Sequence, residues 1–240
     1  MILNLKPEDL DGKAILWRYM DVAKFISMLE QNAIWLARAD TVFDKHEGRF
    51  PVEMQESINK AYQDFDDNDN SPVKDANDFQ EYLIKNTFIS CWHHNLQENM
   101  VMWEIYGKDK NAVAIQTTVD GIASNVNPSV LCGHSLIFKD VTYNNADEVS
   151  GVLKYEDCFF RKRRHFSFEQ EVRISLDTYS RYKPAKRTPY GYKLPILLSG
   201  MIDKVVVHPD SLDWFFDVVT SVAKKYCLRA PVERGVCGNK

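Results

Sequence analysis

Hydrophobic positions along this chain follow two kinds of spacing, and each kind predicts a different element. Short, mostly apolar runs predict buried strands at 14–20, 33–39, 87–92, 112–118, 135–143 and 201–208. Apolar residues three and four positions apart predict helices between Asp21 and Asn32, at 52–65, 78–86, 97–106 and 155–165, and from Pro209 onward. Strands and helices alternate irregularly, which predicts a single α+β domain over 1–240, with its core at about 12–226 and a short tail at 227–240.

Charged residues occupy alternate positions in Phe168–Arg173, just ahead of an apolar run. In an extended strand, successive side chains point to opposite faces. Val172 and Ile174 are therefore expected in a core, whereas Glu169, Glu171 and Arg173 are expected on the opposite face, with a donor such as Arg173 beside Glu171. Such a strand either delivers charge into a cleft or presents a solvated surface.

The same phasing predicts a set of core residues. Eight side chains are expected to be buried: Trp17, Phe25, Leu29, Ile89, Ile115, Val172, Ile174 and Val206. In contrast, 179–195 is rich in Tyr, Lys, Arg and Pro and is expected to be a long exposed loop.

Composition narrows the function classes. A hydrophobic share of 45% and a charged share of 27% are ordinary for a globular protein, and a net charge of -4 gives no global attraction to nucleic acid or to an anionic membrane. No run approaches the roughly 20 apolar residues of a membrane span, so a cytoplasmic protein without membrane contact is expected. Five widely spaced cysteines argue against a disulfide framework and against a metal site.

Familiar nucleotide motifs are missing from the chain. It has neither a phosphate-binding loop nor a Gly-rich dinucleotide fingerprint. Cys91 with His93 and His94 could provide a thiol nucleophile or metal ligands, but residues 91 and 93 share a strand face that 94 opposes, so a buried cysteine with surface histidines is the simpler interpretation. The basic run containing Arg161, Arg163 and Arg164 is either a solvated helix face or an acceptor-binding surface that clamps phosphates.

The remaining polar residues form a possible constellation: Arg18 on an early strand, Ser90 at the end of a middle strand, and Glu169 and Glu171 on a late strand. A guanidinium can hold phosphate by paired hydrogen bonds. A carboxylate can stabilise the positive charge that develops on a ribose as a leaving group departs. The plainer interpretation is that Arg18 pairs with a buried carboxylate and that Ser90 is an ordinary strand hydroxyl.

Several short segments of the sequence resemble those of a known family. They are Leu16-Trp17-Arg18-Tyr19, Arg38-Ala39-Asp40 with 43–48, Ile89-Ser90-Cys91-Trp92-His93, Met102-Trp103 with Tyr106, and 168–173. In this order they look like the bacterial domain-of-unknown-function family twenty-nine seventy-one, over most of the chain up to about His208-Pro209. That family name implies no activity. Trp103 and Tyr106 are either core residues or a ligand stack.

Arg18, Ser90 and the Glu-x-Glu pair also resemble the three-part signature of ADP-ribosyltransferases, although Ser90-Cys91-Trp92 departs from the usual Ser-Thr-Ser. This resemblance implies a split, mixed or antiparallel sheet with flanking helices, and NAD as substrate. It also implies that Glu171 is catalytic, that Glu169 activates the acceptor, and that Ser90 supports the nicotinamide end. Cofactor-binding residues would be Arg18, Tyr19, Ser90, Trp92 and His46.

The leading expectation is therefore an enzyme that transfers ADP-ribose from NAD to a macromolecular acceptor, either protein or nucleic acid. A role as a toxin, a phage-defence factor or a housekeeping modifier is left open. One alternative is a non-catalytic module that binds a nucleotide or a peptide. Another is a phosphodiester-cleaving enzyme with His46 and Glu47 as acid and base.

Overall fold

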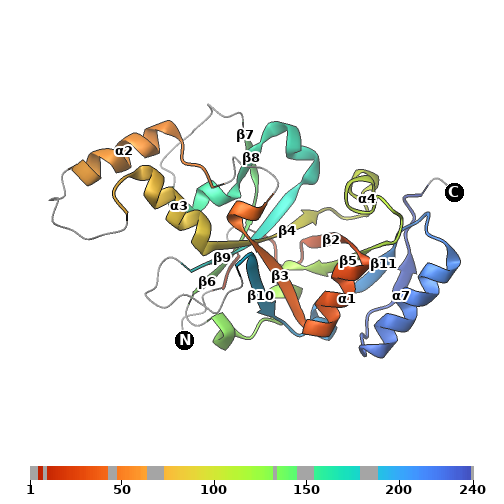
Figure 1. The fold of residues 1–240 in the computed structure, drawn as a ribbon. Coiled ribbons are helices and arrows are strands. Elements are labelled where there is room, and N and C mark those ends of the chain that lie inside the picture. The colour runs from red at the N-terminus through yellow and green to blue at the C-terminus, as the bar shows by residue number, and fades with distance from the viewer. Residues whose placement is uncertain are drawn as a thin grey trace.

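A computed structural model places a large mixed β-sheet at the centre of the molecule, with helices on both faces (Figure 1). The structure describes residues 5–7, 10–42, 48–63, 73–131, 134–144, 154–178 and 189–238. The expected single α+β domain with a mixed sheet is confirmed. None of the helices in these ranges is long and apolar enough to cross a membrane.

The described residues form the following secondary-structure elements. The helices are α1 Val22–Gln31, α2 Val52–Gln63, α3 Ala76–Asn86, α4 Met100–Tyr106, α5 Val119–Ala123, α6 Leu198–Met201 and α7 Asp213–Lys225, with 3-10 turns at Ala39–Thr41, Pro128–Leu131, Tyr155–Phe160 and Arg164–Glu169. The strands are β1 Leu5–Pro7, β2 Ile15–Asp21, β3 Ala33–Arg38, β4 Thr87–His94, β5 Ala112–Thr118, β6 Ser135–Asp140, β7 Thr142–Asn144, β8 Arg161–Arg163, β9 Glu171–Asp177, β10 Gly191–Pro195, β11 Lys204–Val207 and β12 Val232–Arg234.

The main sheet has the order β1-β6-β9-β4-β2-β5-β11-β12, and β3 joins it by pairing with both β4 and β10. The β1–β6 and β11–β12 pairs are parallel, and the other pairs of this sheet are antiparallel. A separate parallel pair, β7–β8, lies beside it. The central strand β4 therefore has one neighbour, β9, on one side and two, β2 and β3, on the other.

Local sequence signals set the limits of α1. The Asp21 side chain accepts a hydrogen bond from the Lys24 backbone N–H at 2.8 Å, which satisfies a free donor in the first turn. Asn32 ends the helix in the left-handed region with φ 46°, a conformation that Asn tolerates better than most residues. Both ends were expected from the sequence. This short helix turns the chain back so that β3 can follow β2.

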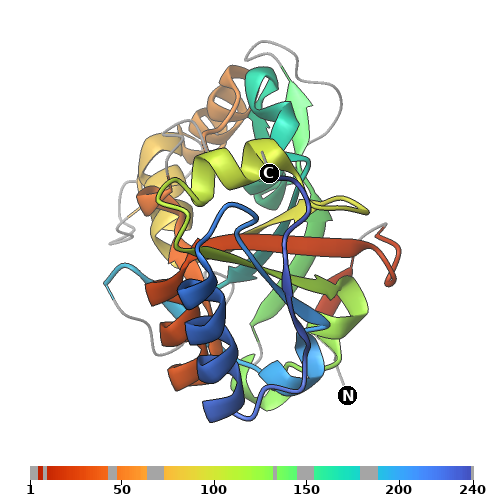
Figure 2. The same cartoon turned by 90° about the vertical axis from the view of Figure 1, so that its right-hand side faces the viewer.

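Three apolar clusters hold the sheet in place. Both α1 and α7 cover one face of it and lie side by side (Figure 2). A smaller cluster under α4 covers the opposite face of β2 and β5, and a third joins α2 and α3 to β4 and β6. All eight predicted core residues are buried, at 6% exposure or less. The predicted burial of these eight residues is confirmed.

Several segments differ from expectation. Residues 135–143, expected as one strand, are divided into β6 and β7, and β7 belongs to the separate β7–β8 pair. Residues 155–165, expected as one helix, form a 3-10 turn, strand β8 and the start of another 3-10 turn. The described part of the expected loop 179–195 contains strand β10, and 179–188 lie outside the described residues. Helix α4 begins later than expected because Asn99 caps it. In the tail, β12 pairs with β11 and extends the sheet beyond residue 226.

Candidate functional site

The main sheet splits along one side of β4. Strand β2 pairs with β4 only through Leu16↔His94 and Trp17↔His93, and β3 pairs with it only through Ala37↔Ile89 and Arg38↔Phe88. Between these junctions, residues 90–92 pair with no strand of the described residues on that side. A cavity of about 540 Å³ occupies the opening, with α1 at its far edge and residues of α4 and β9 also lining it.

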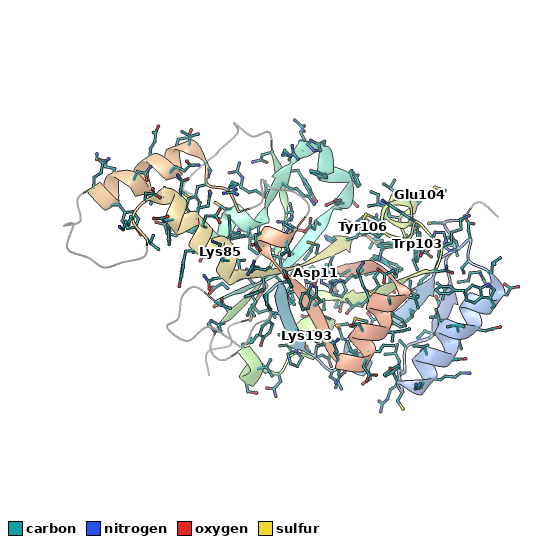
Figure 3. The ribbon with its side chains drawn as sticks, in the orientation of Figure 1. Asp11, Lys85, Trp103, Glu104, Tyr106 and Lys193 are labelled. Carbon is teal, nitrogen blue, oxygen red and sulfur yellow. The ribbon has the colours of Figure 1, made fainter. Side chains whose placement is uncertain are left out.

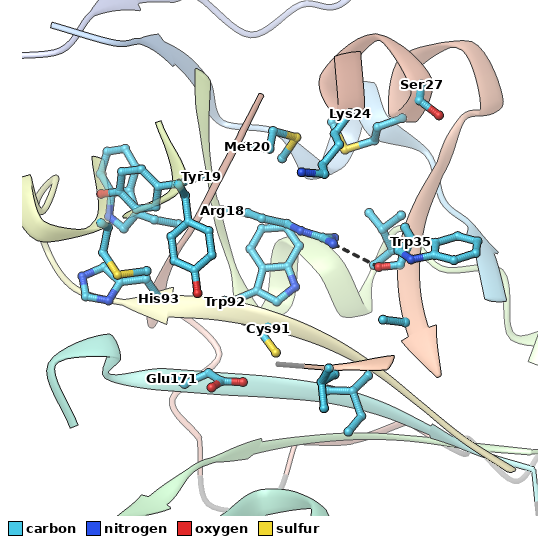
Figure 4. Close-up of a pocket in the computed structure, with 18 of the residues that line it drawn as sticks. Arg18, Tyr19, Met20, Lys24, Ser27, Trp35, Cys91, Trp92, His93 and Glu171 are labelled. Carbon is cyan, nitrogen blue, oxygen red and sulfur yellow. Dashed lines mark hydrogen bonds between the residues drawn. The ribbon is translucent and has the colours of Figure 1, made fainter. Parts of the chain in front are cut away.

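Arg18 spans this opening from β2 to β3. Its guanidinium donates a hydrogen bond to the carbonyl oxygen of Trp35 at 3.0 Å and lies 5.6 Å from the centre of the Trp92 ring (Figure 4). Burial lowers the pKa of Arg18, but an arginine stays protonated at neutral pH. No carboxylate of the described residues forms an ion pair with Arg18. The cavity therefore contains a cation whose charge is available to an anionic ligand, and the expectation that Arg18 pairs with a buried carboxylate is wrong.

Ser90 lies behind the cavity wall. Its side chain is buried, points to the face opposite Cys91, and is not among the residues that line the cavity. The hydroxyl instead accepts a hydrogen bond at 3.1 Å from the indole N–H of Trp92, which does line the cavity. The structure thus brings Arg18, Trp92 and Glu171 together but leaves Ser90 as a support for the Trp92 ring.

The two glutamates of the Glu-x-Glu pair reach the cavity from different backbone conformations. Glu171 is the first residue of β9, but Glu169 ends a 3-10 turn and Gln170 between them is left-handed, with φ 39°. The expectation that both belong to one strand is wrong, because the left-handed residue breaks the alternation. Both side chains are nevertheless buried and line the cavity.

Glu171 is held by two cations. Arg173 approaches its two oxygens at 2.5 and 3.2 Å, and Lys162 Nζ lies 3.4 Å from Oε2. Burial opposes ionisation, but the charge and hydrogen bonds of Arg173, the charge of Lys162 and a hydrogen bond with Cys91 lower the pKa of Glu171 to about 2. The expected donor, Arg173, is confirmed. Glu171 is ionised at neutral pH.

Glu169 has the opposite tendency. Burial and the neighbouring charge of Glu171 raise the pKa of Glu169, although Lys162 donates to its Oε2 at 2.5 Å. Two carboxyl groups whose environments move their pKa values apart are typical of sites where one stabilises charge and the other accepts a proton.

The residues of the basic run that includes Lys162 lie in different environments. Lys162 is the middle residue of β8, and its side chain turns inward to both glutamates. Arg161 and Arg163 are half-buried on the same strand, Arg164 is exposed, and none of these three arginines lines the cavity. The helical interpretation of this run is wrong, and the sequence analysis missed Lys162; a period-two reading of 161–163 would have separated it from its neighbours.

His93 lies on β4 at the point where the pairing of β4 with β2 ends. The ring is buried and lines the cavity, and its Nδ1 lies 2.6 Å from the carbonyl oxygen of Glu169. Because a carbonyl oxygen only accepts, Nδ1 carries the proton and Nε2 is an acceptor, for which no described residue provides a partner. Burial lowers the pKa of His93, so the ring is neutral. The expected pattern of a buried cysteine with surface histidines is wrong for two of the three residues: Cys91 is exposed in the cavity and His93 is buried, whereas the His94 side chain is 41% exposed.

Helix α4 closes the side of the cavity near the glutamates. Trp103 and Tyr106 both lie on this helix (Figure 3); Trp103 is buried, whereas Tyr106 is exposed and lines the cavity. Tyr19 also lines it, and its hydroxyl accepts a hydrogen bond at 2.8 Å from Asn99, the residue that caps α4. Of Trp103 and Tyr106, only Tyr106 is therefore placed to contact a ligand. His46 and Glu47 lie outside the described residues.

No group of three or more metal-ligating side chains occurs in the described parts of the chain. The available chemistry is therefore a cation for phosphate, aromatic faces, and a carboxylate pair with separated pKa values.

No family model and no curated protein matches this chain, so the resemblance to a known sequence family stays a prediction. Among solved structures, the chain is similar to one described as Thermus sp. 2.9 DarT in complex with ADP-ribosylated ssDNA. The TM-score is 0.41 and the identity 8%, over 96% of this chain and 97% of that chain. A likeness at this level assigns neither a family nor an activity.

Proposed function

We propose that this protein is an ADP-ribosyltransferase that consumes NAD and transfers ADP-ribose to a protein or nucleic acid acceptor. The observation that supports it best is a single cavity that holds both Arg18, which forms no ion pair with a described residue, and a buried ionised carboxylate, Glu171. NAD carries a diphosphate beside a ribose that bears a cationic leaving group. The two charges in the cavity complement these two parts of the molecule.

The residues divide the reaction between them. Arg18 binds the diphosphate. Glu171 stabilises the positive charge that develops on the ribose carbon as its bond to nicotinamide breaks and nicotinamide leaves with the electron pair. Glu169, whose pKa is raised, takes the proton that the acceptor nucleophile loses as it bonds to that carbon. Arg173 and Lys162 keep Glu171 ionised and oriented.

The main alternative is a non-catalytic nucleotide-binding module, and one observation favours it. Both oxygens of Glu171 already accept hydrogen bonds from Arg173, and Lys162 approaches one of them. A carboxylate that is neutralised in this way stabilises a developing cation less than a bare one does.

The direct test is incubation with NAD labelled on its adenylate phosphate, together with whole-cell lysate. We expect release of free nicotinamide and transfer of the label to a macromolecule. Label in nucleic acid would identify the acceptor class and direct attention to Arg161, Arg163 and Arg164, the arginines that flank Lys162 in the sequence. Binding of NAD without any release of nicotinamide would establish the binding module instead.

Replacing Arg18 by methionine should weaken binding of ADP-ribose by about ten- to a hundred-fold, because each charge-assisted hydrogen bond to a phosphate is a large part of the affinity. Isothermal titration calorimetry measures this directly and needs no turnover. The matched control is Arg38→Met, since Arg38 lies on β3, pairs with Asp40 at 2.7 Å and does not line the cavity. Equal affinities in wild type and Arg18→Met would remove Arg18 from the site.

A further inference from the structure

Trp35 is exposed in the same cavity, and the chemistry proposed above makes no use of its side chain. On strand β3, Ile34 and Leu36 are fully buried against the main core, whereas Trp35 points to the opposite face and is 37% exposed. A large aromatic side chain that lines a cavity and keeps this much exposed surface is available to a ligand.

The indole is held against the neighbouring strand. At Gly191 on β10, an added Cβ atom would lie 2.2 Å from Cζ2 of Trp35, so the ring rests where any other residue would place a side chain. Ala33 and Ala37, the residues of β3 on the same face, are small and line the cavity as well. Trp35 therefore projects from a surface with little else on it, and Gly191 fixes the position of its ring.

Two cations lie beside Trp35. Lys193 is its direct cross-strand partner in the β3–β10 pair, is exposed, and lines the cavity. Arg18 donates to the carbonyl oxygen of Trp35 and lies between it and the Tyr19 and His93 side of the cavity (Figure 4). Within the described ranges, no aromatic ring stacks on Trp35 and no cation lies over it.

We infer that Trp35 and Lys193 form a second subsite, which takes the purine base of an adenine nucleotide. A planar base stacks favourably on an exposed indole, and the phosphates, which are joined to the base through the ribose, would meet Lys193 and Arg18. The inference rests on the proposed function in one respect: it assigns the adenosine end of NAD to the β3–β10 side and leaves the nicotinamide end at Glu171. The subsite itself requires only an adenine nucleotide.

The test is calorimetric titration with ADP, which lacks the nicotinamide end. Trp35→Ala should weaken ADP binding about ten-fold, whereas Trp35→Phe, which keeps an aromatic face, should bind within about three-fold of wild type. Trp214→Ala is the matched control, because Trp214 is an exposed tryptophan on α7 that does not line the cavity. It should bind ADP as wild type does.

Inorganic pyrophosphate separates stacking from a general disturbance of the fold. Its affinity should be the same in wild type and Trp35→Ala, since it has no base. Equal loss of ADP and pyrophosphate affinity, or no loss of either, would overturn the subsite. Nicotinamide release is scored separately: base-dependent ADP binding with no release supports the subsite and removes the transferase, whereas release with unchanged ADP binding in Trp35→Ala does the reverse.

Discussion

Glu171→Gln should lower the rate of nicotinamide release by about a thousand-fold or more, as loss of a principal electrostatic group does in other enzymes. Glutamine keeps the length of the side chain and fills the same space. It lacks the negative charge that stabilises the cation developing on the ribose carbon. The effect should appear in kcat more than in KM, because the charge interaction strengthens as the reaction proceeds. Release is measured by chromatography of free nicotinamide.

The same substitution also affects the stability of the fold. Glu171 pairs with the fully buried Arg173, so a neutral side chain at 171 leaves that cation without its partner and lowers stability. All rates should therefore be compared well below the melting temperature of the weakest variant. Asp177→Asn is the control, since Asp177 is buried on the same face of β9 and does not line the cavity. Unchanged release by Glu171→Gln would refute the mechanism, whatever the protein binds.

Arg173→Met should cost about 3 to 5 kcal/mol of unfolding free energy at neutral pH, the usual penalty for removing one partner of a buried ion pair. Methionine fills a similar volume but leaves Lys162 as the cation of the described residues that still approaches Glu171. It also removes the hydrogen bond from Nη1 to the carbonyl oxygen of Phe159 at 2.7 Å. Urea denaturation at pH 7 measures the loss. Arg49→Met is the comparison, because Arg49 pairs with Glu81 at the surface and should contribute less than about 1 kcal/mol.

The loss of unfolding free energy in Arg173→Met should also depend on pH, and it should become smaller as the pH falls. The pKa of Glu171 is lowered in the folded protein to about 2, below the ordinary value of about 4.3 for an unfolded glutamate. Its ionisation therefore stabilises the fold fully above the unfolded value, and this contribution is lost as the pH falls toward 2. Because Arg173 is the main cation lowering that pKa, the difference between wild type and Arg173→Met should shrink over this window. A difference that is constant from pH 7 to pH 3 would contradict the assignment.

Much of the fold could be predicted because its signals are local. Asp21 and Asn32 limit α1 through hydrogen bonds within a few residues, and the alternation of Val172 and Ile174 is set by strand geometry. The left-handed turn at Gln170 has no such signal, since Gly or Asn would be the expected residue there. It separates Glu169 from the strand and changes its neighbours.

The site was predictable in its charges but not in its pairings. Arg18 and Glu171 do line one cavity, as the pattern of charged strand positions indicated. Lys162 was hidden in a run of like charges. A strand period turns it to the opposite face from Arg161 and Arg163, but tertiary contact decides which of the two faces meets the glutamates. Ser90 was wrongly expected in the site. Its side chain is buried on the face of β4 opposite Cys91, so its hydroxyl does not line the cavity.

The last described residues of the chain are tied to the wall of the cavity. Beyond β12, the backbone N–H of Val236 donates to Glu98, and the same carboxylate accepts the indole N–H of Trp103 on α4. Cys237 also contacts the backbone of Glu98 at 3.5 Å. Glu98 lies next to Asn99, which caps α4 and holds Tyr19. Residues 236 and 237 therefore help to hold α4 against the cavity, and limited proteolysis near residue 236 should report whether this contact is intact.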